Sequence, residues 1–352
     1  MPRTVCCERR KKMEIFKEAQ KNFDYMVRIR RHMHEYPEMT GQEFETLEFI
    51  KKELDALGIE YVEVPDGGIV GQIHGGKPGK TVLMRADMDA LPIQENTKNL
   101  CCDKLCVSKN DGISHACGHD SHTAMLLGEA KILNEHKDEL NGNIVLCFER
   151  GEEGGGQIAN LLPYIVETMK LPIDTCIEMW IRDSSRSVAP LEAAVLTMGR
   201  IEGGTAANVI PDTVTMEGTV RTVSRETRAL MEEKIRQIAC HGAEALGASC
   251  EVEYKRGVPA VICDPAVVER IRKAAAEELG SENVVTLETP SMGSEDFARY
   301  LELVPGAMFR IGTASEDPAT RLPLHNGGIR FDERAVLAGA VTFGRLAAEY
   351  LR

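Results

Sequence analysis

Residues 142–156 are Gly-Asn-Ile-Val-Leu-Cys-Phe-Glu-Arg-Gly-Glu-Glu-Gly-Gly-Gly. The apolar run over 143–148 is typical of a buried strand, and the segment after it places two adjacent carboxylates, Glu152 and Glu153, at the end of that strand. Neighbouring side chains of an extended chain point in different directions. One glutamate can therefore bind a cation while the other acts on a water molecule beside it, as metal-assisted hydrolysis requires.

A second polar segment precedes this strand. Residues 115–123 are His-Ala-Cys-Gly-His-Asp-Ser-His-Thr, which places three imidazoles, a thiol and a carboxylate close together. Alternate side chains of an extended segment share a face, so His115, Cys117 and His119 are expected to point at one spot, as a metal site requires. Thiolate and imidazole ligands suit zinc or another late first-row ion, and added carboxylates also admit manganese.

Around these segments, helical and strand patterns alternate. Apolar runs over 69–73 and 81–85, separated by the glycine-rich turn 75–79, predict a hairpin. A strand is also expected over 174–178, and helices are expected over 14–34, 42–57, from His122 onward and near 157–169. This alternation predicts an α/β fold with active residues at strand ends.

The pattern changes after residue 182. Strands are expected over 194–201, 213–220 and 250–254, with a helix over 225–246. From Asp264 the α/β alternation resumes, with helices expected to residue 279, from Ser294 and over 332–351, and strands over 284–287 and 307–311. We therefore expect a catalytic domain split into residues 1–185 and 259–352, with a mixed central sheet flanked by helices. A small α+β lid domain, residues 186–258, is inserted between the two parts.

Composition excludes some classes of partner. A formal net charge of -13 argues against nucleic acid or an anionic membrane surface as the main partner, because both attract basic faces. No apolar run approaches the roughly 20 residues of a membrane span, and a cytoplasmic location is expected. The 11 cysteines are odd in number and scattered, so they do not predict a disulfide framework.

Several motifs carry a family resemblance. They are Arg85-Ala-Asp-Met-Asp-Ala-Leu-Pro-Ile-Gln-Glu95, Ser114-His-Ala-Cys-Gly-His-Asp120, Glu152-Glu153, Gly203-Gly-Thr-Ala-Ala-Asn-Val-Ile-Pro-Asp212, Gly218-Thr-Val-Arg-Thr222, Ser294-Glu-Asp-Phe297 and Pro323-Leu-His-Asn326. In this order they resemble the metal-dependent amidohydrolases of the aminoacylase and carboxypeptidase metallopeptidase family, and most closely the hippurate and indoleacetyl-amino-acid hydrolases. The resemblance implies a dinuclear metal site, a lid domain and hydrolysis of N-acyl amino acids.

The resemblance also implies roles for individual residues. Cys117 would be a thiolate that bridges two divalent metal ions, with His119, Glu153 and His325 as further ligands. Glu152 would be the general base. The ions would be manganese or zinc, with cobalt or nickel as alternatives.

Five other residues have two interpretations each. Asp87 and Asp89 either orient a metal ligand or cap a strand end, and His122 either supports the site or is an ordinary satisfied histidine. By the resemblance, Asn208 and Arg221 bind the substrate carboxylate, a task that suits the bidentate guanidinium. The alternative for this pair is a structural turn and a surface salt bridge.

Two departures from the family pattern bear on activity. Glu178 stands where we expect the family to have a histidine that binds the second ion, and a carboxylate there would shift the preference toward manganese or magnesium. After Trp180 the chain passes almost directly to Ser185, so the lid is expected to lack its first strand and helix. Family dimers use the lid, and its truncation leaves a homodimer as an open prediction.

These patterns predict an enzyme that hydrolyses the amide bond of small-molecule N-acyl amino acids, such as hippurate or acetyl amino acids. Two alternatives remain. The first is a weakened relative that binds metal or ligand without efficient turnover, and the second is a dipeptidase or carboxypeptidase.

Overall fold

The computed structural model describes residues 14–98, 103–154, 161–182, 194–287 and 293–351. The chain divides into two compact units. Unit 1 comprises Met1–Ser185, Cys263–Val284 and Val304–Arg352, and unit 2 comprises Arg186–Ile262 and Val285–Leu303. The predicted lid ended at residue 258, whereas unit 2 continues to Ile262 and takes in a second segment. The domain limits themselves stay a prediction.

Unit 1 contains a six-stranded mixed sheet in the order β1-β2-β4-β3-β5-β8. Its strands are β1 (Glu60–Val64), β2 (Gly68–His74), β3 (Lys77–Asp87), β4 (Asn141–Glu149), β5 (Thr175–Arg182) and β8 (Gly306–Gly312). The pairs β1–β2 and β2–β4 are antiparallel, and the pairs β4–β3, β3–β5 and β5–β8 are parallel. The carboxyl ends of β3 and β4 therefore lie side by side.

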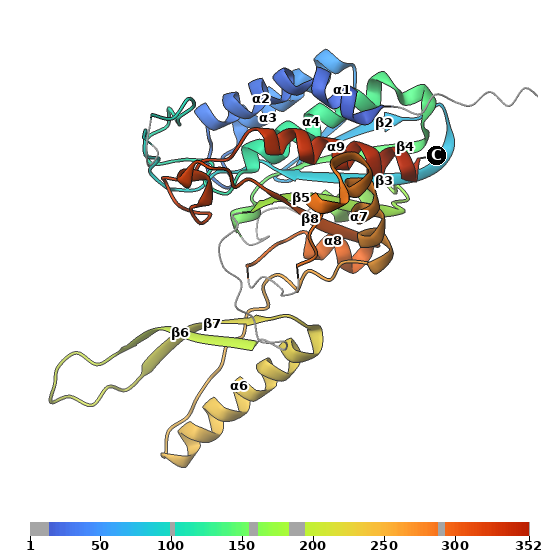
Figure 1. The fold of residues 1–352 in the computed structure, drawn as a ribbon. Coiled ribbons are helices and arrows are strands. Elements are labelled where there is room, and N and C mark those ends of the chain that lie inside the picture. Colours follow the sequence, from blue (N-terminus) through green and yellow to red (C-terminus); the bar gives the residue numbers. More distant parts are fainter. Residues whose placement is uncertain (1–13, 99–102, 155–160, 183–193, 288–292, 352) are drawn as a thin grey trace, which may run out of the picture. The chain divides into compact units, whose positions relative to one another are not determined.

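Helices cover this sheet (Figure 1). The longer ones in unit 1 are α1 (Ile15–Lys21), α2 (Phe23–Glu35), α3 (Phe44–Leu57), α4 (His119–Glu135), α7 (Pro265–Leu279) and α9 (Arg334–Tyr350). Short turns are η1 (Lys137–Glu139), η2 (Glu152–Gly154), α5 (Leu161–Pro163), η3 (Tyr164–Thr168), η4 (Ser281–Asn283) and η5 (Pro318–Arg321). The predicted α/β class, with a mixed central sheet flanked by helices, is confirmed.

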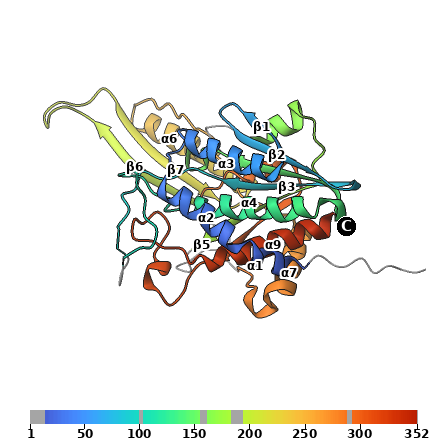
Figure 2. The ribbon, with the colours of Figure 1, turned by 90° about the horizontal axis from the view of Figure 1, so that it is seen from above.

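Helix α4 is central to the helical layer. It contacts α2 and α9 as well as strand β3, and Figure 2 looks onto this layer. Most of its side chains are buried, from His119 to Leu133. Because it is enclosed on several sides, its first residue, His119, has a fixed position at the edge of the sheet. None of the described helices is both long and apolar enough to cross a membrane.

The predicted hairpin over 69–85 is wrong. Strands β2 and β3 do not pair with each other, because β4 lies between them and pairs with both. Gly142, at the start of β4, has φ 112, and a Cβ there would lie 2.0 Å from the carbonyl oxygen of Lys80. The missing side chain lets β4 enter beside β3, and local sequence could not reveal this long-range insertion. The strand expected over 284–287 is also absent, and most of these residues are exposed.

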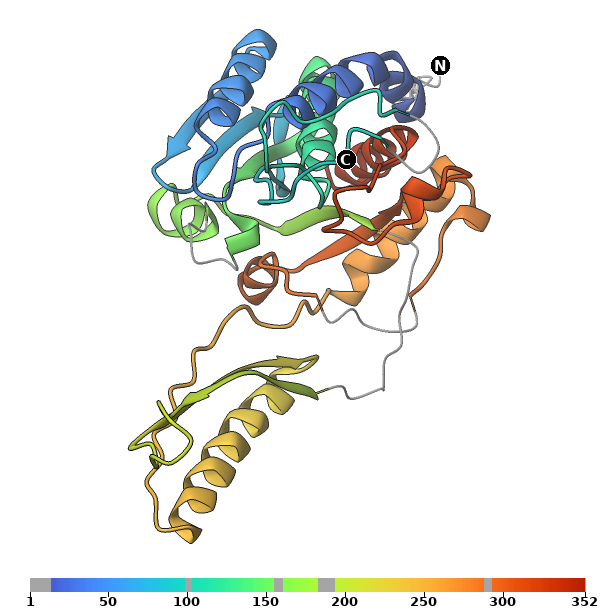
Figure 3. The same cartoon turned by 90° about the vertical axis from the view of Figure 1, so that its left-hand side faces the viewer.

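Unit 2 contains a two-stranded antiparallel ribbon and a long helix (Figure 3). These are β6 (Ala194–Gly203), β7 (Val214–Thr222) and α6 (Arg225–Ala245), and the short α8 (Ala298–Leu303) also belongs to this unit. Ser224 caps α6 by accepting a hydrogen bond from the Thr227 amide at 3.1 Å. The strand expected over 250–254 is not formed. Residues 183–193 lie outside the described residues, so the missing first strand and helix of the lid stay a prediction.

Candidate metal centre

The candidate centre lies where two parallel strands of unit 1 end. Asp87 is the last residue of β3 and pairs in register with Glu149, the last residue of β4. The chain beyond β4 turns at once into η2, which carries Glu152 and Glu153. Helix α4 begins beside them at His119, after Gly118, whose φ of 94 is a backbone conformation that favours glycine.

The structure gathers donor atoms from three distant segments. The ligand atoms of Cys117, Glu153 and His325 all lie within 4.8 Å of one another, and so do those of His119, Glu152 and Glu153. Glu153 Oε1 is 3.4 Å from His325 Nε2 and 3.9 Å from His119 Nε2. Because Glu153 belongs to both groups, the arrangement offers two adjacent positions for cations.

Three buried atoms at this place have no hydrogen-bond partner among the described residues. They are Asp87 Oδ2, His119 Nε2 and Glu153 Oε1. Leaving a buried polar atom without a partner costs about 1–3 kcal/mol, so native proteins rarely do so. A divalent cation beside His119 and Glu153 would satisfy His119 Nε2 and Glu153 Oε1, and the donor set fits such an ion.

Asp89 orients two of these residues. Its Oδ1 lies 3.0 Å from His119 Nδ1, and its backbone carbonyl oxygen lies 2.9 Å from the same nitrogen. Its Oδ2 accepts hydrogen bonds from Thr40 Oγ1 at 2.6 Å and from the Glu153 amide at 3.0 Å. With Nδ1 of His119 held in this way, Nε2 is left to face the donor cluster.

Asp87 and His122 form a second supporting pair. Asp87 Oδ1 lies 2.6 Å from His122 Nδ1, whereas its Oδ2 faces His119 Nε2 at 3.6 Å. Thr123 Oγ1 donates to the Asp87 carbonyl oxygen at 2.8 Å. The ligand atoms of Asp87, His119 and His122 thus make a third close group.

Charges in the centre depend on one another. Burial disfavours the imidazolium of His119, but Asp87, Cys117 and the hydrogen bond that His119 donates to Asp89 together raise its pKa well above the usual value. Burial raises the pKa of the Cys117 thiol despite the neighbouring His119. Burial also opposes ionisation of Asp87, yet His119 and His122 hold its pKa below the usual range. A bound cation would take over the role of the proton on His119 and favour the thiolate.

His325 reaches the cluster from the carboxyl-terminal part of unit 1. Its amide donates to the Ala116 carbonyl oxygen at 3.0 Å, which joins its loop to the segment that carries Cys117. Its φ is 61, an uncommon conformation for a residue other than glycine. The nearby carboxylate of Glu153 raises the pKa of His325, although partial burial works against this.

Glu178 does not join the donor groups found among the described residues. It pairs in register with Arg85 in the middle of the parallel sheet, and its Oε1 accepts from Arg85 Nη1 at 2.5 Å. Arg85 Nε also donates to Glu149 Oε2 at 2.7 Å. Arg85 lies two residues before Asp87 on β3, so strand register places Glu178 in a buried ion-pair network instead of at the end of β3.

The other predicted residues lie elsewhere. His115 is buried but belongs to none of the donor groups, because the turn at Gly118 and the start of α4 interrupt the extended segment that was expected to align it. Burial lowers the pKa of His115 to about 4. Asn208 and Arg221 are exposed residues of unit 2, and substrate binding by them stays a prediction.

Sequence reasoning missed several supporting residues. Thr40, which contacts Asp89, lies in a bridge and turn region and carries no motif signal. Asp120 binds Arg30 Nε at 2.9 Å and lies 2.8 Å from His34 Nδ1. The place of Asp120 beside His119 is a sequence signal that could have found it, whereas His34 stands outside every motif quoted above.

Comparison with known proteins shows the family of this chain. The model of peptidase family M20/M25/M40 matches residues 83–349. N-acetyl-L-cysteine deacetylase of Bacillus subtilis is 33% identical over 365 residues, which cover 89% of this chain and 85% of the relative. IAA-amino acid hydrolase ILR1-like 4 of Arabidopsis thaliana is 31% identical over 386 residues, which cover 94% of this chain and 86% of the relative.

A solved structure of the same family is also similar to this chain. It is a Bacillus subtilis protein described as a dinuclear metal-binding peptidase from the M20 family, with a TM-score of 0.81 and 30% identity, and the match covers 94% of this chain and 99% of that one. The predicted family and the predicted enzyme class, a metal-dependent amidohydrolase, are confirmed. The chain belongs to peptidase family M20/M25/M40.

Proposed function

We propose that this protein hydrolyses the amide bond of N-acyl amino acids with two divalent ions held by Cys117, His119, Glu153 and His325. The observation that carries the proposal is the pair of donor groups that share Glu153. The related dinuclear structure supports the number of ions. Bound ions would polarise the amide carbonyl and lower the pKa of a water molecule to near ~7.

Sulfur, nitrogen and oxygen donors together limit the choice of metal. A thiolate and two imidazoles favour zinc, cobalt or nickel over magnesium, and the carboxylate also admits manganese. We therefore propose zinc or manganese. Substitution Cys117→Ser is expected to lower affinity for zinc more than affinity for manganese, because the hydroxyl is a harder ligand.

Glu152 is the proposed general base. Its Oε2 lies 3.8 Å from His119 Nε2, so its carboxylate borders the place where the ions would sit. It shares the short turn η2 with Glu153, and its side chain is 11% exposed. In this position it can take a proton from the attacking water and deliver it to the departing amine.

The relatives support the substrate class. One is named for deacetylation of N-acetyl-L-cysteine and the other for hydrolysis of indoleacetyl amino acids. Both substrates are N-acyl amino acids with a free carboxylate. We assign binding of that carboxylate to Asn208 and Arg221, and we keep a cytoplasmic location as a prediction.

The test is a substrate panel with the metal-loaded protein. Hydrolysis of N-acetyl amino acids, hippurate and indoleacetyl amino acids is measured beside hydrolysis of unblocked dipeptides. We expect the N-acyl substrates to give the higher kcat/KM. Faster cleavage of dipeptides would instead favour the peptidase alternative, and metal binding without turnover would favour the weakened relative.

A variant tests the general base. Glu152→Gln is expected to lower kcat by about 10²–10⁴-fold while the content of bound metal stays the same. Glu60→Gln, at an exposed position of β1, makes the same chemical change away from the centre and should leave kcat unaltered. Unchanged turnover in Glu152→Gln would refute the role.

A further inference from the structure

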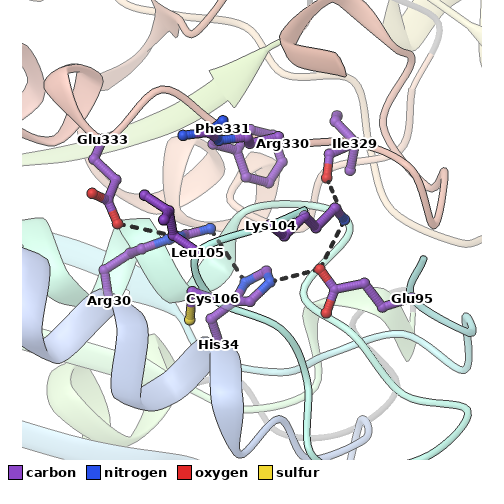
Figure 4. A pocket seen from close by; sticks show the side chains of 10 residues that line it. All are labelled: Arg30, His34, Glu95, Lys104, Leu105, Cys106, Ile329, Arg330, Phe331 and Glu333. Carbon is purple, nitrogen blue, oxygen red and sulfur yellow. Dashed lines mark hydrogen bonds and ion pairs between the residues drawn. The ribbon is translucent and has the colours of Figure 1, made fainter. Parts of the chain in front are cut away.

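Lys104 is a buried lysine outside the donor cluster. Its ammonium donates to Glu95 Oε1 at 2.8 Å, to the Gly327 carbonyl oxygen at 3.2 Å and to the Ile329 carbonyl oxygen at 3.0 Å. Only 4% of the side chain is exposed. The three donors of the ammonium thus meet three acceptors, and Figure 4 shows this side chain directed at Glu95 on one side and Ile329 on the other.

Two of these acceptors belong to the loop that carries His325. The same loop is also held where the Asn96 amide donates to the Gly327 carbonyl oxygen at 2.9 Å. These hydrogen bonds matter because His325 has φ 61, a left-handed backbone conformation. A residue other than glycine keeps this conformation only when its surroundings impose it. Lys104 supplies the charged part of this restraint, because its ammonium binds the carbonyl oxygens of Gly327 and Ile329, two and four residues after His325.

Glu95, the counterion of Lys104, is itself fixed. Its Oε2 accepts from the Ser108 amide at 2.6 Å, and its Oε1 lies 3.0 Å from His34 Nε2. The other ring nitrogen of His34 lies 2.8 Å from Asp120 Oδ2, and Asp120 follows His119 at the start of α4. Figure 4 shows the Lys104, Glu95 and His34 part of this network. A continuous set of buried polar contacts therefore joins the His325 loop to the start of the helix that carries His119.

We propose that Lys104 is a positioning residue for His325, and that through the His325 loop it sets the affinity of the centre for one of its two ions. The inference rests on the proposed function, in which His325 is a ligand. Groups that hold a ligand in place typically change metal affinity by about 10–100-fold when they are removed. Lys104 does not touch the donor atoms, so its effect must pass through the loop.

The test measures metal binding by the metal-free protein. Zinc is titrated in competition with a chromophoric chelator, and cobalt is titrated while the thiolate charge-transfer and d–d bands are recorded. In Lys104→Met we expect one ion to bind about 10–100-fold more weakly, whereas the thiolate band from Cys117 persists. Lys104→Arg keeps a cationic donor and should recover most of the lost affinity.

A lysine of the same region provides the control. The side chain of Lys98 is 78% exposed, and its nitrogen lies 3.9 Å from Asp103 Oδ1, so Lys98→Met removes the same charge without touching the network. Its two metal affinities should equal those of the unaltered protein. Equal loss in both methionine variants would mean that charge alone is responsible and would overturn the proposal.

His325→Ala separates failure of this inference from failure of the proposed function. If His325→Ala weakens metal binding but a folded Lys104→Met does not, the inference is wrong and the proposed centre stands. If His325→Ala also binds both ions normally, the proposed ligand set is wrong.

Two further measurements apply if Lys104→Met does not fold. Lys104→Gln, which keeps a hydrogen-bond donor but no charge, takes its place in the same titration and should also weaken one ion. In the unaltered, metal-free protein, the amides of residues 325–329 should exchange hydrogen slowly, because the network holds the loop before metal binds. Exchange as fast as in an unstructured peptide would contradict the proposal.

Discussion

Asp89 is the residue on which the geometry of the centre most depends, although it offers no atom to the donor groups themselves. It contacts the ring of His119, the hydroxyl of Thr40 and the amide of Glu153. Asp89→Asn keeps the shape but removes the negative charge that makes His119 a stronger ligand. We expect metal affinity to fall by about 10–100-fold, measured by competition with a chelator.

Thr40→Val serves as the matched control for Asp89. It removes one neutral hydrogen bond to the same carboxylate and leaves the contact with His119 in place. Its metal affinity should fall less than that of Asp89→Asn. An equal or larger loss in Thr40→Val would show that Asp89 acts through packing and not through the imidazole.

The sequence predicted which side chains have the chemistry of metal ligands, but not every contact that they make. Cys117, His119 and Glu153 stand in short motifs, and the structure brings their donor atoms together with His325. The contact of His325 with these motifs could not be derived locally, since His325 lies far along the chain from all of them. Thr40 gave no signal at all, because a hydroxyl that supports a carboxylate occurs in any polar turn.

In the central sheet, a buried ion-pair network joins three strands. Arg85 on β3 donates to Glu149 on β4 and to Glu178 on β5, and all three side chains are at most 2% exposed. Arg85→Met would leave two carboxylates buried without their counterion. Unfolding by urea should then report a loss of about 3–5 kcal/mol in the free energy of unfolding.

An exposed pair gives the comparison for this network. Arg28 binds Glu53, and its side chain is 52% exposed, so Arg28→Met should cost no more than about 1 kcal/mol. Adding Glu149→Gln and Glu178→Gln to Arg85→Met removes the uncompensated charges and should recover stability. If the triple variant is as unstable as Arg85→Met, lost packing of the arginine stem is responsible instead.

Helix α4 contains a buried acidic residue, Glu129, that affects how stability depends on pH. Glu129 is fully buried, and neither of its carboxylate oxygens has a hydrogen-bond partner among the described residues. Burial raises the pKa of Glu129 well above the usual value of 4.5, so the folded protein retains the proton that the unfolded chain releases above that pH. The unfolded state then binds fewer protons, and stability falls as pH rises, by about 1.4 kcal/mol per pH unit.

Glu129→Gln should remove this dependence. Relative to the unaltered protein, the metal-free variant is expected to gain stability progressively from pH 5 to pH 7, as measured by urea unfolding. Glu135→Gln, at an exposed position of the same helix, should show no such pH-dependent difference. A constant difference between Glu129→Gln and the unaltered protein across this range would mean that Glu129 is ionised in the folded state.

The order of helices and strands could be predicted better than their pairing. The pattern of residues 142–156 predicted a strand that ends in adjacent carboxylates, and β4 followed by η2 has this form. It could not show that β4 inserts between β2 and β3, because pairing depends on contacts far along the chain. For the same reason Glu178 was expected to bind metal, whereas its register opposite Arg85 places it inside the sheet.

Across the whole chain, the proposed ions would connect segments that the backbone keeps far apart. The donor residues run from Cys117 to His325, and all of them lie in unit 1. The buried ligand atoms His119 Nε2 and Glu153 Oε1 have no hydrogen-bond partner among the described residues, and burying an unpartnered polar atom destabilises the folded form. Binding to the folded state alone stabilises it by about 2.7 kcal/mol at a free metal concentration of 100 times Kd.

Removal of metal by a chelator should therefore lower the Tm of the thermal transition that reports on unit 1, and added zinc or manganese should restore it. His325→Ala, which lacks one proposed ligand, should gain less from added metal, whereas Glu152→Gln should gain as much as the unaltered protein because it retains every proposed ligand. Differential scanning calorimetry with metal analysis of each sample makes the comparison. A Tm that stays constant after the bound metal is shown to be gone would contradict a centre that links these segments.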